Sequence, residues 1–122
     1  MSSAPPGGRD DRAGPGVLPL AAARARLGAE PGALYTELLR HGTLSVEIYA
    51  PRGVDEQEPH SRDEVYVVAS GSGEFVCGER RDRFGPGDLI FVPASMNHRF
   101  VNFSSDLAVW VLFYGPEGGE RP

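Results

Sequence analysis

Residues 58–71 of the chain read EPHSRDEVYVVASG, and this stretch decides the fold. Its second half is an apolar run that ends at a serine and a glycine, which is typical of a buried strand that stops at a turn. In its first half, Glu58 and His60 are two residues apart, so on one strand their side chains share a face. Residues 61–63 turn the chain, and Glu64 opens the returning strand. The pattern therefore places metal-ligand chemistry around a single β-turn.

A second stretch, residues 87–102, reads GDLIFVPASMNHRFVN. Its apolar run over residues 89–92 is predicted to be a buried strand that Pro93 stops, and a new strand begins at His98. If that strand and the one opened by Glu64 line the same barrel, their side chains converge inside it. Imidazole and carboxylate donors without thiolate suit a divalent ion such as iron, manganese, nickel or zinc.

The remaining strands follow from turn signals and alternation. The 122 residues include 16 glycines and 11 prolines, which favours many turns and an all-β fold. Leu44, Val46 and Ile48 alternate with polar residues in a half-buried strand, and residues 35–40 are predicted to pair with it across a His-Gly turn. About eight short strands indicate a β-sandwich or barrel. The aromatic and aliphatic residues expected in the core or cavity wall are Phe91, Phe100, Trp110, Leu112 and Tyr114.

The chain length fits one domain with unequal ends. Residues 1–16 are rich in glycine and proline and poor in apolar side chains, which predicts a disordered arm. Residues 17–30 are predicted to hold a short helix over 17–27 and a linker. The barrel is expected over residues 31–116, and residues 117–122 are expected to form a flexible tail.

Charge and composition exclude several classes of function. The net charge of −5, without a basic tract, disfavours nucleic acid as a partner. No apolar run approaches the roughly 18 residues that span a bilayer, and the first residues lack the apolar segment of a signal peptide. One cysteine and no lysine exclude a disulfide framework and Schiff-base chemistry. We therefore expect a cytoplasmic protein, and its Ala/Gly/Arg/Pro bias is typical of a GC-rich bacterial genome.

The two stretches resemble the two motifs of the cupins. The first motif, G-x5-H-x-H-x(3,4)-E-x6-G, is matched from His60 to Gly71. The second, G-x5-P-x-G-x2-H-x3-N, is matched throughout residues 87–102 except that Ser95 replaces a glycine. The resemblance covers residues 43–114 and implies an all-β cupin jelly-roll barrel of about six to eight strands, preceded by the short helix.

The resemblance also implies one divalent metal ion bound by His60, Glu64 and His98. Glu58 stands where the motif has its first histidine, so the fourth ligand stays open. The Glu58 carboxylate is one candidate, and Gln57 can replace it if the strand register slips. A second glutamate would make the site formally neutral, which lowers Lewis acidity and favours a harder ion.

Further roles remain open for individual side chains. Tyr66 shares the face of Glu64, so its hydroxyl either reaches the cavity as a catalytic group or its ring packs as ordinary core. Glu58 is a metal ligand, a catalytic general base or a solvated acid in the run DEQE. His98 has the alternative of a core histidine bonded to Asn102 or to a backbone group.

Two kinds of function follow from this reading. The nearly intact ligand set favours a metal-dependent enzyme that acts on a small organic molecule inside the barrel. Such an enzyme is a dioxygenase, or an isomerase, cyclase or lyase that uses the metal to polarise a carbonyl. The alternative is a non-catalytic cupin that binds a metal or small ligand. Family resemblance and an apolar edge strand over residues 33–39 predict a homodimer.

Overall fold

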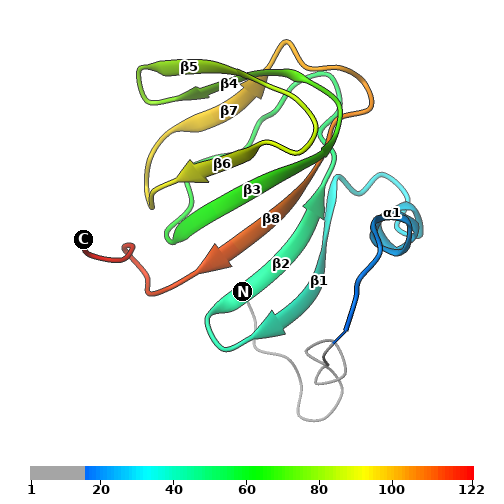
Figure 1. Cartoon of the computed structure of the whole chain (residues 1–122), viewed down its shortest axis with the longest axis horizontal. Helices are drawn as coiled ribbons and strands as arrows, with labels where there is room; N and C mark the ends of the chain where they lie inside the picture. The colour runs from blue at the N-terminus through cyan, green and yellow to red at the C-terminus, as the bar shows by residue number, and fades with distance from the viewer. Residues whose placement is uncertain (1–15) are drawn as a thin grey trace.

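The computed structural model describes residues 16–122, which form two facing antiparallel sheets with one helix outside them (Figure 1). The larger sheet has the order β1-β2-β8-β3-β6, and the smaller has the order β5-β4-β7. The all-β barrel predicted from sequence is confirmed, while the predicted arm falls, except for Gly16, outside the described residues. The elements are α1 (Leu20–Gly28), β1 (Tyr35–His41), β2 (Leu44–Tyr49), β3 (Asp63–Ser70), β4 (Gly73–Cys77), β5 (Arg80–Phe84), β6 (Leu89–Val92), β7 (His98–Val101) and β8 (Ala108–Tyr114).

The inner faces of the two sheets meet in a core that contains several aromatic rings. Tyr66 of β3 packs on Phe100 of β7, with ring centroids 5.0 Å apart, and Phe75 of β4 lies 4.9 Å from Phe100. All three side chains are buried. Since burying a side chain of this size stabilises the fold by about 1.5–3 kcal/mol, the cluster fixes the separation of the two sheets.

A second core lies on the outer face of the larger sheet, beneath α1 (Figure 1). Ala23 of the helix packs with Leu38, Val46 and Ile48. The apolar face of β2 therefore points away from the barrel interior, and its polar face points into it. The helix begins at Leu20 rather than at residue 17, because Pro19 is extended and serves as its N-cap.

The prediction that residues 89–92 form a buried run is wrong. Leu89 is 66% exposed and Phe91 is 52% exposed, although Val92 is buried. The reason is topological: β6 is an edge strand of the larger sheet and pairs only with β3. Residues on one face of this short strand therefore remain at the surface.

The loop between β6 and β7 contains the one mismatch to the second cupin motif, and its backbone explains the usual glycine. Ser95 has a φ of 70°, in the left-handed region that glycine adopts without steric cost. Its amide donates a 2.7 Å hydrogen bond to the carbonyl of His60. Gly87, the first residue of the second motif, has a φ of 89°. The strained serine thus joins the two loops that carry the histidines.

We predict that Ser95→Gly stabilises the protein by about 0.5–1 kcal/mol, because removing the β-carbon relieves strain that outweighs the entropy glycine gains on unfolding. Urea unfolding measures the change. Ser105→Gly, at an exposed position without a positive φ, is the control and should destabilise slightly. Lower stability for Ser95→Gly than for the natural protein would contradict this account.

Candidate metal centre

Three side chains with metal-ligand chemistry meet between the sheets. His60 lies in the loop before β3, Glu64 is the second residue of β3, and His98 is the first residue of β7. One ligand atom of each lies within 4.8 Å of the others. Nε2 of His98 is 3.1 Å from Oε1 of Glu64, and Nε2 of His60 is 3.9 Å from the same oxygen. The fold therefore brings together the three residues that the cupin resemblance implied.

The buried Glu64 carboxylate lacks a conventional partner. Its side chain is 1% exposed, and among the described residues neither oxygen has a hydrogen bond of good geometry. Nδ1 of His98 lies 2.8 Å from the carbonyl of Met96, so Nδ1 carries the proton that it donates there. The lone pair of Nε2 then faces a carboxylate, and a proton on Nε2 or a bound metal ion offsets the cost of this buried charge. A divalent ion fits this donor set.

The pKa directions of the two histidines reflect these surroundings. Burial lowers the pKa of His60 despite the nearby Glu64, so its imidazole is neutral and can ligate. For His98, burial acts in the same direction, but Glu64 and the carbonyl of Met96 outweigh it and raise the pKa. His98 is thus the imidazole that takes up a proton more readily when no metal is bound.

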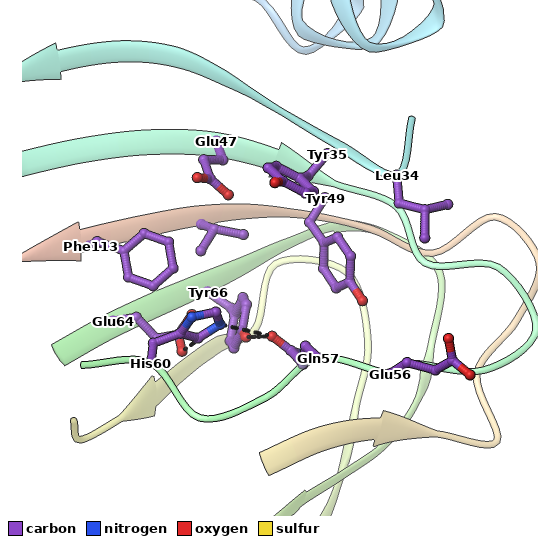
Figure 2. A pocket seen from close by; sticks show the side chains of 11 residues that line it. Leu34, Tyr35, Glu47, Tyr49, Glu56, Gln57, His60, Glu64, Tyr66 and Phe113 are labelled. Carbon is purple, nitrogen blue, oxygen red and sulfur yellow. Dashed lines mark hydrogen bonds and ion pairs between the residues drawn. The ribbon is translucent and has the colours of Figure 1, made fainter. Parts of the chain in front are cut away.

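Gln57, and not Glu58, faces the site. Oε1 of Gln57 lies 3.2 Å from Nε2 of His60 and accepts a 3.0 Å hydrogen bond from the hydroxyl of Tyr66 (Figure 2). Glu58 is exposed and is not part of the ligand cluster. Residues 56–60 are not in a strand, so the alternation that linked Glu58 to His60 does not apply there. The sequence offers Gln57 as the fourth ligand only if the strand register slips.

Asp55 holds Gln57 in this orientation and was not identified from the sequence. Its buried carboxylate accepts hydrogen bonds from the side-chain nitrogen of Gln57 at 2.7 Å, the hydroxyl of Tyr49 at 2.5 Å and the amide of Phe100 at 2.8 Å. Because the Gln57 nitrogen is occupied by Asp55, its oxygen must point to Tyr66. In the sequence, Asp55 belongs to the acidic run DEQE, which resembles a solvated loop.

The hydroxyl of Tyr66 reaches the cluster, as expected for a residue that shares a strand face with Glu64. It lies 3.1 Å from Nε2 of His98, and the side chain is 1% exposed. Burial, followed by the charge of Glu64, raises the pKa of Tyr66 well above its ordinary value. The ring also packs in the core, so Tyr66 belongs to the core and faces the cluster with its hydroxyl, while its catalytic role stays a prediction.

A pocket of about 460 Å³ opens beside the cluster. It is lined by Leu34, Tyr35, Glu47, Tyr49, Glu56, Gln57, His60, Glu64, Tyr66, Val111 and Phe113. Glu47 comes from the polar face of β2. The alternation in the sequence predicts a half-buried strand, in which such a polar face ordinarily meets solvent. Burial, with the like charges of Glu37 and Glu64, raises the pKa of Glu47 to about 7.

Residues 45–114 match the cupin domain family. This chain is a cupin. An uncharacterized protein of Streptomyces coelicolor is 39% identical over 95 residues, which cover 76% of this chain and 90% of that protein. A Cupin 2 conserved barrel domain protein from Salinispora arenicola superposes with a TM-score of 0.62 at 20% identity, covering 84% of this chain and 90% of that one.

A relative with a named activity matches over a smaller region. The acireductone dioxygenase of Leishmania major is 34% identical over 79 residues, which cover 52% of this cupin and only 23% of that protein.

In residues 16–122, no helix is long and apolar enough to cross a membrane.

We predict that Asp55→Asn destabilises the cupin by about 2 kcal/mol, because the new amide leaves at least one buried donor facing another donor. Chemical denaturation measures this, with Asp106→Asn at an exposed turn as the control. A loss no greater than that of the control would show that Asp55 does not anchor the loop.

Glu47→Gln is expected to raise the thermal unfolding midpoint more at pH 8 than at pH 5. An acid whose pKa rises on folding, here from 4.5 to about 7, costs stability once the pH exceeds the unfolded value, and the cost is complete above the folded value. The amide removes that cost. Midpoints across this range test the prediction, with Glu79→Gln, exposed in a turn, as the control. An equal gain at both pH values would refute it.

Proposed function

We propose that this cupin is a metal-dependent enzyme that acts on a small organic molecule in the pocket beside His60, Glu64 and His98. The carrying observation is the buried Glu64 carboxylate, which has no hydrogen bond, lies beside two imidazoles and lines an open pocket. A purely structural ion would be enclosed by protein ligands, whereas a catalytic ion keeps a position open for substrate. We also propose that the protein is cytoplasmic and forms a homodimer.

The side chains around the cluster favour proton-transfer chemistry, as in an isomerase, cyclase or lyase. A bound divalent ion supplies Lewis acidity that polarises a substrate oxygen. The Tyr66 hydroxyl stands where it can exchange a proton with a substrate atom beside the cluster, and Gln57 holds that hydroxyl in place. Glu58, exposed outside the cluster, is the weaker candidate for a general base, and Gln57 is the stronger candidate for a fourth ligand.

A second candidate is a dioxygenase. Two histidines and one carboxylate with open positions form the ligand set of many non-haem iron oxygenases, and the acireductone dioxygenase relative supports this reading. That activity belongs to a much longer protein, so for this chain it is a proposal. A cupin that only binds its ligand is the third outcome.

The metal itself is tested by native mass spectrometry of protein purified without added metal. We expect one divalent ion per chain, and His60→Ala and His98→Ala should each lower the affinity at least a hundredfold. His41→Ala, at the exposed end of β1, is the control and should retain the ion. Unchanged metal content in both site variants would remove the metal site and leave a small-ligand binder.

The fourth position is resolved by comparing Gln57→Ala with Glu58→Ala in the same measurement. We expect Gln57→Ala to weaken metal binding about tenfold and Glu58→Ala to have little effect. Oxygen uptake with a panel of enediols and β-hydroxy carbonyl compounds then separates the chemistries, since a lyase or isomerase consumes no oxygen. Substrate-dependent oxygen uptake would favour the dioxygenase.

A further inference from the structure

The charges that line the pocket are all negative apart from any metal. Glu47, Glu56 and Glu64 are its carboxylates, and its lining includes neither arginine nor lysine. A divalent ion at Glu64 brings the formal total to −1 when all three are ionised. A substrate carrying a carboxylate or phosphate away from the metal would therefore find no basic side chain to pair with, and would meet like charge instead.

Acidic and aromatic side chains lie side by side on the inner face of β1 and β2. In the register of the two strands, Tyr35 lies opposite Tyr49 and Glu37 lies opposite Glu47. The carboxylate of Glu37 is bound by Arg40 at 2.8 Å. Glu47, in contrast, takes part in no hydrogen bond or ion pair among the described residues, and it projects into the pocket beside the two tyrosines (Figure 2).

The two rings suit the same kind of ligand as the carboxylate. The hydroxyl of Tyr49 is committed to Asp55 by a 2.5 Å hydrogen bond, which leaves its ring as the contact surface for a ligand. Tyr35 is 59% exposed and stands at the mouth of the pocket. Aromatic faces attract ammonium groups through their quadrupole, and a neighbouring carboxylate adds charge complementarity.

Glu64 is a buried carboxylate that lines the same pocket as Glu47. Both of its oxygens are buried without a hydrogen-bond partner, and its field extends to Glu47, whose pKa it helps to raise. A metal would neutralise Glu64, but it would leave Glu47, on a different strand, with only the electrostatic attraction of Arg40.

We propose that the substrate carries a positively charged amine or quaternary ammonium group, bound between Glu47 and the rings of Tyr35 and Tyr49. The inference rests on the proposed function, because it concerns the pocket that opens beside the metal ligands. It names Glu47 as the residue that determines specificity for charge.

The test uses three probes of matched size: benzylamine, benzyl alcohol and benzoate. Their binding to the full-length protein is measured by NMR titration near pH 8, where Glu47 is ionised and the amine is still largely protonated. We expect benzylamine to bind at least tenfold more tightly than benzyl alcohol. Glu47→Gln should abolish that preference, and Tyr35→Leu should reduce it several-fold.

Glu79→Gln, outside the pocket, should leave the preference intact. Equal binding of the amine and the alcohol, or a preference for the amine that survives in Glu47→Gln, would overturn the inference. The metal proposal is judged separately, by metal content in His98→Ala. A charge preference without bound metal would uphold the cation site and refute the metal enzyme, and bound metal without the preference would do the reverse.

Discussion

The buried carboxylate of Glu64 is the interaction on which the site depends. It is held 3.1 Å from an imidazole nitrogen of His98, whose other nitrogen is fixed by the carbonyl of Met96. This geometry brings two electron-rich groups together in the interior, and either a proton on His98 or a bound metal ion offsets their repulsion. The barrel supplies that arrangement by placing β3 in one sheet and β7 in the other, with aromatic rings holding the sheets at a fixed separation.

A second carboxylate, that of Asp55, organises the side of the site that the metal ligands do not reach. It is linked through Gln57 to Tyr66 by consecutive hydrogen bonds, and the Tyr66 hydroxyl lies 3.1 Å from Nε2 of His98. Such networks fix side-chain orientation, and losing one member leaves its neighbours unsatisfied. The pocket thus joins a rigid polar wall around the metal ligands to an acidic and aromatic wall on β1 and β2.

The sequence predicted most of the fold and the clustering of His60, Glu64 and His98, because those features depend on spacing. His60, Glu64 and His98 lie at motif positions, and the alternation around Val46 located a strand correctly. Spacing says less about which side of a strand is the inside. Because α1 covers the face of β2 that carries Val46 and Ile48, Glu47 on the other face lines the pocket. Likewise, strand alternation favours Glu58 over Gln57 as the fourth ligand only if residues 56–60 form a strand. In the structure they form a loop, so the alternation does not apply. Phe91 is exposed because β6 lies at the edge of the larger sheet, and the local sequence does not determine the order of strands in a sheet.

The central claim is that a divalent ion is held by two imidazoles and one carboxylate. X-ray absorption spectroscopy of the protein purified without added metal tests it most directly, because imidazole ligands give characteristic outer-shell scattering. The account predicts nitrogen and oxygen ligands, at about 2.0–2.2 Å for a zinc-like ion, with two imidazoles per metal. In His98→Ala, reloaded with an excess of the same metal, the number should fall to one. A bound metal without imidazole scattering, or a spectrum unchanged in that variant, would contradict it.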